Sequence, residues 1–183
     1  MCKKLKEIHD LKPSDVLNKY YSQEKHPIDV RTILAKMGID CFSVDFAKLE
    51  KDLYLSGNDA ILGIACSEGD DIKILYSNEL GDADANYVLA HELAHCCLHL
   101  PVTADFHVEL KTENDIYSPA FKRSIFKKSK ENEADRFAAS LLIPTDKLME
   151  YLLEVGSPSI QTIAEYFSVP EHLARKKIDE LKV

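Results

Sequence analysis

The chain has 183 residues, and its 23 Lys+Arg against 31 Asp+Glu give a formal net charge of −8. Hydrophobic residues make up 45% and charged residues 30%, which is typical of a globular protein of one domain. The acidic balance argues against proteins that coat nucleic acid or bind anionic membranes, because those partners favour basic chains.

The five cysteines and the N-terminal sequence favour a cytoplasmic protein. The cysteines form no CxxC pair, and an odd number leaves one over in any disulfide scheme. Lysines follow the first two residues, but no apolar secretory segment comes after them, and no apolar run is long enough to span a membrane. We therefore expect reduced, packed thiols, including Cys96 and Cys97.

Two helices are expected near the N-terminus. The first begins at Pro13, and the second covers residues 27–38, with Pro27 in its first turn and Gly38 as its C-cap. The apolar residues of this second segment recur at helical spacing, at Val30, Ile33, Leu34 and Met37.

Three strands are expected after these helices, over residues 39–46, 60–66 and 71–76. The first and third alternate in polarity, and the second is a short apolar run. Turn-forming residues separate the last two strands, which predicts an antiparallel hairpin. We expect the three strands to form a small antiparallel sheet.

The rest of the chain is predicted to be mainly helical. A long helix begins at Asp82 and stops before Pro101. The stretch 102–130 has weak periodicity and is expected to be a loop with one short helix, whose basic run over 122–130 is a solvated face. Further helices are expected over residues 131–142, 145–154, 159–167 and 170–181.

The long helix contains an H-E-x-x-H motif that starts at His91. Histidines four residues apart differ by about 40° around a helix and about 6 Å along it, so both imidazoles face one point. Burying two unpaired histidines in an apolar helix would be costly. The spacing therefore predicts His91 and His95 as metal ligands, with Glu92 placed to reach a water in an open coordination position.

A catalytic zinc needs a third protein ligand, and the acidic start of helix 131–142 can supply it. Glu131 and Asp135 lie one turn apart, so one can bind the metal while the other accepts the free N–H of a ligand histidine. Glu133 is the competing ligand, and helix geometry favours Glu131. Acidic residues also suit a helix N-terminus in the absence of any metal.

Two sequence blocks carry this set: His91-Glu-Leu-Ala-His95 with Leu98-His99, and Glu131-x-x-Ala134-Asp135-x-Phe137-Ala138-Ala139-x-Leu141-Leu142-x-Pro144. Together they resemble the ImmA/IrrE family of metallopeptidases, and the resemblance extends over about residues 27–170. The family often has Asn where Asp135 stands and Gly where Ala94 stands. Neither change removes a ligand.

The resemblance implies a zincin-like fold of the α+β class, with a small antiparallel sheet packed with the H-E-x-x-H helix and further helices. It also implies that His91, His95 and Glu131 bind the metal and that Glu92 is the catalytic base. We expect residues 1–158 to form the metallopeptidase domain and 159–183 a short helical tail that resembles a helix-turn-helix.

The tail carries Arg175, Lys176 and Lys177, but nearby acidic residues dilute this charge. Packing of two helices is therefore favoured over direct binding of nucleic acid.

The function implied by the resemblance is a zinc-dependent endopeptidase that cleaves a helix-turn-helix transcriptional repressor at a specific site, as in the control of mobile elements. Bound zinc lowers the pKa of water to about 7, and Glu92 would take and return the proton. Mn²⁺ or iron can occupy the same ligands. The alternative is an antirepressor that inactivates its partner by association and uses the metal structurally.

Two further expectations concern substrate binding. Strand 60–66 or strand 71–76 is expected to hold an extended peptide by strand pairing. The donor that stabilises the oxyanion is left open among Tyr87, His99, His107 and Tyr117.

Overall fold

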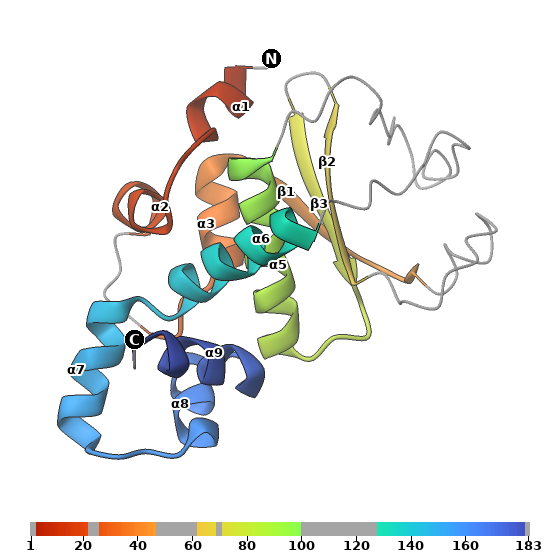
Figure 1. Cartoon of the computed structure of the whole chain (residues 1–183). Coiled ribbons are helices and arrows are strands. Elements are labelled where there is room, and N and C mark those ends of the chain that lie inside the picture. The colour runs from red at the N-terminus through yellow and green to blue at the C-terminus, as the bar shows by residue number, and fades with distance from the viewer. Residues whose placement is uncertain (1–2, 22–25, 47–61, 69–70, 100–127, 182–183) are drawn as a thin grey trace.

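The computed structural model describes residues 3–21, 26–46, 62–68, 71–99 and 128–181. Predicted features at His107, Tyr117 and residues 122–127 lie outside these ranges. In chain order (Figure 1) the elements are α1 (Lys3–Ile8), α2 (Pro13–Tyr20), α3 (Val30–Met37), β1 (Asp40–Val44), β2 (Gly63–Glu68), β3 (Asp71–Ser77), α5 (Asp82–Leu98), α6 (Lys128–Leu142), α7 (Thr145–Val155), α8 (Ile160–Phe167) and α9 (Glu171–Leu181).

The three strands form one sheet in the order β1-β3-β2. The predicted hairpin is confirmed, because β2 and β3 pair antiparallel with Ala65 opposite Ile74. The prediction of a wholly antiparallel sheet is wrong, since β1 pairs parallel with β3 and places Cys41 opposite Ile74. A tight turn determines the direction of the two strands it joins, whereas alternation in β1 carries no information about direction.

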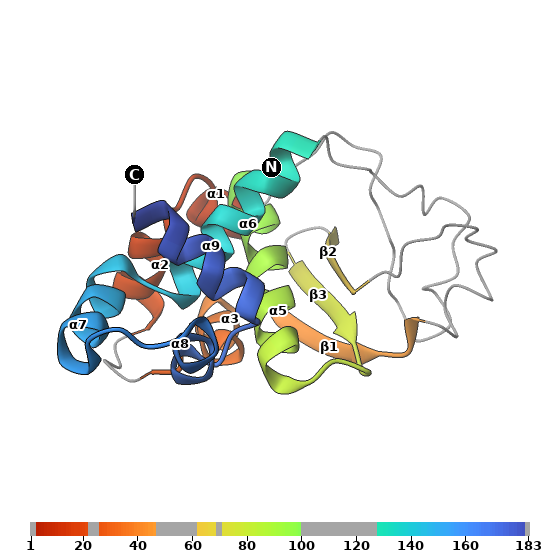
Figure 2. The same cartoon turned by 60° about the horizontal axis from the view of Figure 1, so that its bottom comes forward.

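The helices of the described residues lie on one side of the sheet, with α5 nearest to it (Figure 2). Helix α5 packs against β2 and β3 and against α6, which explains why it is apolar on nearly all sides. These layers contribute six of the large, fully buried side chains: Ile72, Ile74, Leu89, Leu93, Leu141 and Leu142. This packing holds the middle of α5 between the sheet and α6.

Helix α3 begins three residues later than predicted. The carboxylate of Asp29 accepts a hydrogen bond from the backbone N–H of Arg31 at 3.1 Å, so Asp29 is the N-cap and Pro27 lies before the helix. The predicted C-cap is confirmed, because Gly38 has a left-handed φ of 67° that favours glycine.

A buried asparagine joins α5 to the start of α3. The side chain of Asn86 accepts a hydrogen bond from the N–H of Val30 at 2.9 Å and donates one to the carbonyl of Ile28 at 2.8 Å. Asn86→Ala is expected to lower the free energy of unfolding by about 2–3 kcal/mol, because both backbone groups lose their buried partner. Urea unfolding measures this change.

The control is Asn132→Ala, at an exposed position of α6, which is expected to change stability by less than about 0.5 kcal/mol. Equal effects of the two substitutions would contradict a structural role for Asn86.

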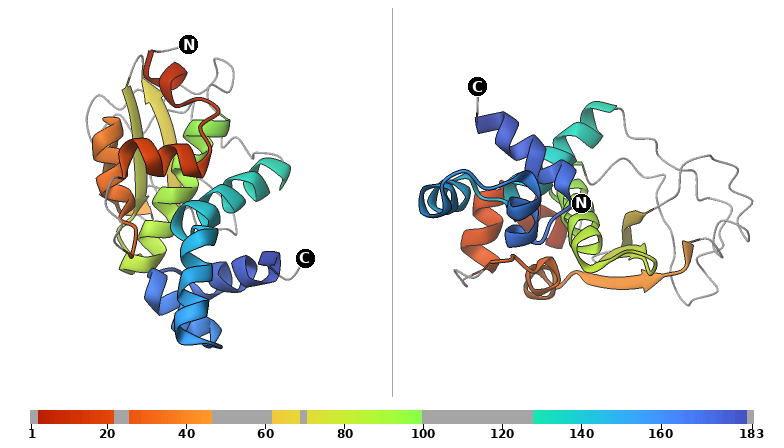
Figure 3. Two further views of the ribbon diagram at one scale, coloured as in Figure 1. Left: turned by 90° about the vertical axis from the view of Figure 1, so that its left-hand side faces the viewer. Right: turned by 90° about the horizontal axis from the view of Figure 1, so that it is seen from below.

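Helices α7, α8 and α9 gather at the end of the molecule away from the sheet (Figure 3). They share the main core through Leu148, Phe167 and Leu173. Lys177 of α9 is buried and donates to Oγ of Ser140 on α6 at 3.2 Å. The tail helices are thus packed onto the rest of the fold.

Four cysteines lie in the described residues, and all are free thiols as predicted. Burial raises the pKa of Cys96 well above its usual value and that of Cys97 to about 12. Both are therefore inert, packed thiols. No helix in the described part of the chain has the length and hydropathy of a membrane span.

Candidate metal centre

Helices α5 and α6 bring three predicted residues to one point. Nε2 of His91 lies 3.0 Å from Nε2 of His95 and 3.2 Å from Oε2 of Glu131. Nε2 of His95 lies 3.6 Å from the other carboxylate oxygen of Glu131. One ligand atom from each residue falls within 4.8 Å of the others, so the set can hold a metal ion.

The spacing of these atoms fits a small tetrahedral cation. Zinc ligands lie at about 2.0–2.2 Å from the metal, so neighbouring ligand atoms lie about 3.4 Å apart. The 3.0 Å between the two Nε2 atoms and the 3.2 Å from Nε2 of His91 to Oε2 of Glu131 are close to that edge length, while the 3.6 Å from Nε2 of His95 is measured to the other oxygen of Glu131. Two imidazole nitrogens and one carboxylate leave a fourth position open, as in catalytic zinc sites.

Solvent reaches this point from the α6 side. The side chain of Glu131 is 45% exposed, whereas those of His91 and His95 are 16% and 5% exposed.

Asp135 contacts His91 on the side away from the point where the three residues converge. Nδ1–H of His91 donates to Oδ1 of Asp135 at 3.0 Å, and the Tyr87 hydroxyl donates to the same oxygen at 2.8 Å. The hydrogen bond from His91 lowers the pKa of Asp135 against the effect of burial, and Tyr87 lowers it further. With its proton held on Nδ1, His91 presents the lone pair of Nε2 to the centre.

These contacts also affect the imidazole of His91. Burial disfavours its charged form, but the hydrogen bond and charge of Asp135, with the nearby glutamates, raise its pKa overall. A metal ion bound here would therefore compete with protons for this residue, and its binding would weaken as the pH falls.

His99 contacts His95 on the side away from the metal centre. Its Nδ1 lies 2.8 Å from Nδ1 of His99, and Nε2 of His99 lies 3.3 Å from Oε2 of Glu133. Burial and the neighbouring histidines lower the pKa of His95 to about 3, so it is neutral, as a metal ligand must be. Glu133, the competing candidate, thus contacts His99, while Glu131 contacts the two motif histidines.

Glu92 lies beside the triad, against the edge of β2. A Cβ at Gly63 would come within 3.0 Å of both Cγ and Oε1 of Glu92 and within 2.5 Å of Cγ1 of Val88. This partial burial raises the pKa of Glu92 to about 7, although His91 and the backbone N–H of Ala65 oppose the rise. A carboxyl group with this pKa can both accept and return a proton near neutral pH.

No role at the site was predicted for Gly63. Its small size permits the close approach of β2 to α5, and a glycine within a strand pattern is the signal that could have indicated this.

Two of the four candidate oxyanion donors lie in the described residues, and each of them contacts a residue of the metal centre. The Tyr87 hydroxyl is bonded to Asp135 behind His91, and His99 lies behind His95. His107 and Tyr117 lie outside the described residues.

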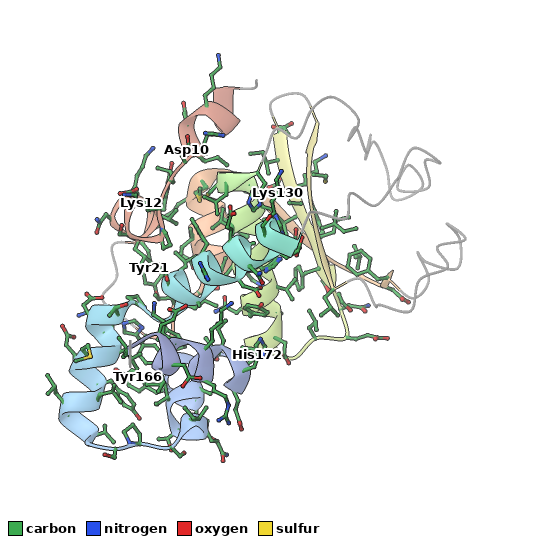
Figure 4. The ribbon with its side chains drawn as sticks, in the orientation of Figure 1. Asp10, Lys12, Tyr21, Lys130, Tyr166 and His172 are labelled. Carbon is green, nitrogen blue, oxygen red and sulfur yellow. The ribbon has the colours of Figure 1, made fainter. Side chains whose placement is uncertain are left out.

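Helix α9 adds two side chains that the sequence analysis did not place here. Nζ of Lys176 lies 3.5 Å from Oδ2 of Asp135. The His172 ring, labelled in Figure 4, packs edge-on against the Tyr87 ring with centroids 5.3 Å apart. No spacing signal links residues so far apart in the chain, so these contacts could not be predicted.

The comparisons with known proteins agree with this arrangement. A family model described as the IrrE N-terminal-like domain (Peptidase_M78) matches residues 67–179, which is well over half of the chain. The matched region includes every site residue described above except Gly63 and Ala65. No curated protein and no solved structure matches the chain.

Proposed function

Because the chain belongs to the IrrE N-terminal-like family of metallopeptidases, we propose that it is a zinc-dependent endopeptidase that cleaves a helix-turn-helix transcriptional repressor at a specific bond. The observation that carries the proposal is the convergence of His91, His95 and Glu131 beside the carboxyl group of Glu92. The net charge of −8 suits a basic, DNA-binding partner.

His91, His95 and Glu131 would hold the metal in the proposed reaction. A divalent cation held there would polarise the scissile carbonyl and acidify water. Glu92 accepts a proton from the attacking water and delivers it to the leaving amine. Asp135 keeps His91 in the tautomer with a free lone pair on Nε2.

Strand β2 is the candidate for holding an extended substrate. The other predicted strand, 71–76, is β3, which is paired on both sides and offers no free edge. Among the described residues, no strand pairs with the outer edge of β2, and β2 lies beside Glu92. Added-strand pairing there would bring a peptide past the metal centre.

The ladder indicates which residue of β2 faces outward. The backbone N–H of Ser77 donates to the carbonyl of Leu62. Hydrogen-bonded and non-hydrogen-bonded pairs alternate along an antiparallel ladder. Ile64 therefore also bonds to β3, while the N–H of Ala65 faces away from β3. The N–H of Ala65 already bonds to the carboxyl group of Glu92, so the next outward position, Ser67, gives the cleaner test. Ser67→Pro is expected to lower the rate of repressor cleavage at least about 10-fold, because it removes one outward donor and keeps the ladder.

Cleavage of the repressor, followed on gels, measures this effect, and circular dichroism checks the fold. Cys66→Ala, which keeps the backbone N–H, is the control and should cleave normally. A Ser67→Pro variant that folds and cleaves at the wild-type rate would exclude pairing on β2.

The test of the proposed function is incubation of the zinc-loaded protein with a repressor encoded beside it. Wild type is expected to release two fragments whose masses identify one bond, and Glu92→Gln is expected to release none. If Glu92→Gln binds zinc and still relieves repression, the protein acts as a non-proteolytic antirepressor. That result would overturn the proposal.

A further inference from the structure

His99 lies against His95 on the side away from the metal centre. The two Nδ1 atoms are 2.8 Å apart, and Nε2 of His99 is 3.3 Å from the carboxylate of Glu133. The two histidines are only 4% and 8% exposed, so water has little access to the contact between them. The three side chains form one continuous line from α5 to α6.

The order of donors and acceptors along this line follows from chemistry. A carboxylate only accepts, so Nε2 of His99 carries a proton and donates it to Glu133. Nδ1 of a neutral His99 is then an acceptor. The proton between the two rings therefore belongs to Nδ1 of His95, which leaves a lone pair on Nε2 of His95, directed at His91 and Glu131.

We propose that His99, oriented by Glu133, is the positioning residue of His95 and sets the tautomer in which Nε2 can bind a metal. It does for the second histidine of the motif what Asp135 does for the first. The inference rests on the ligand role of His95 in the proposed function. His99 itself is not among the three residues whose ligand atoms converge.

Two substitutions at the same position separate this role from simple packing. Asn places its side-chain oxygen the same number of bonds from Cα as Nδ1 of histidine, so His99→Asn keeps an acceptor for His95. His99→Phe keeps a ring of similar size and offers no acceptor. Removing the partner of a ligand histidine commonly weakens metal binding about 10–100-fold.

The first measurement is the affinity of the full-length, metal-depleted protein for Zn²⁺ in competition with a chelator. His99→Phe is expected to bind about 10–100-fold more weakly than wild type, and His99→Asn within about threefold of it. Wild-type affinity in His99→Phe would overturn the proposal. So would equal losses in both variants, because packing alone would then explain them.

The second measurement needs no variant to fold. Long-range ¹H–¹⁵N correlation spectra of the metal-depleted wild type report which nitrogen of each histidine carries the proton. We expect His95 protonated at Nδ1 and His99 at Nε2, and a proton on Nε2 of His95 would overturn the proposal. Neither measurement uses cleavage, so a failure to cut any repressor would refute the proposed function and leave this inference standing.

Discussion

Glu92→Gln is expected to lower the rate of peptide-bond cleavage by about 10²–10⁴-fold while leaving zinc binding nearly unchanged. Gln has the same shape and cannot take a proton from water. Zinc should stay bound because Glu92 is not among the three residues whose ligand atoms converge. Cleavage of the repressor under single-turnover conditions and metal analysis of the same sample measure the two effects. Full activity in this variant would show that another group is the base.

The same substitution is expected to stabilise the metal-free fold at neutral pH. The pKa of Glu92 rises from 4.5 to about 7 on folding. Between these values the folded protein holds a proton that the unfolded chain has lost, so stability falls as the pH rises through this window. Gln has no such dependence, and the side chain is partly exposed, so the gain should approach about 2 kcal/mol at pH 8 and vanish near pH 4.5.

Urea unfolding in the presence of a chelator, at several pH values from 5 to 8, measures this difference. Glu79→Gln is the control, since Glu79 is exposed, and its effect should stay within about 0.5 kcal/mol. A Glu92→Gln variant that is equally stable at both ends of the range would contradict the partial burial of this carboxyl group against β2.

Glu131→Gln is expected to weaken Zn²⁺ binding by more than about 100-fold, because it replaces an anionic ligand with a neutral amide. Glu133→Gln is the matched control two residues away on α6. Its amide oxygen can still accept from His99, so its affinity should stay within about threefold of wild type. Chelator competition measures both, and the reverse order of effects would make Glu133 the third ligand.

The motif helices were predictable because their signals are local. The spacing of His91 and His95 places both rings on one face, and the same angular argument ranks Glu131 above Glu133 as a ligand. The hairpin followed from a turn between two apolar runs. In each case residues a few positions apart carry the information.

The features that were missed depend on contacts between distant parts of the chain. The direction of β1 depends on which edge of the sheet it joins, and the start of α3 is bonded to Asn86 of α5 through Ile28 and Val30. Lys176 reaches Asp135 only because α9 packs on α6. No local periodicity or residue spacing indicates any of these features.

The two helices that meet at the metal centre are far apart in sequence, with His91 on α5 and Glu131 on α6. A cation held by both would act as a cross-link that closes the intervening length of chain, much as a disulfide does. Its binding energy would add to folding, by about 4 kcal/mol at a free metal concentration 1,000 times the Kd. The metal supply of the cell would then set both how much of this protein is active and how long the rest survives proteolysis.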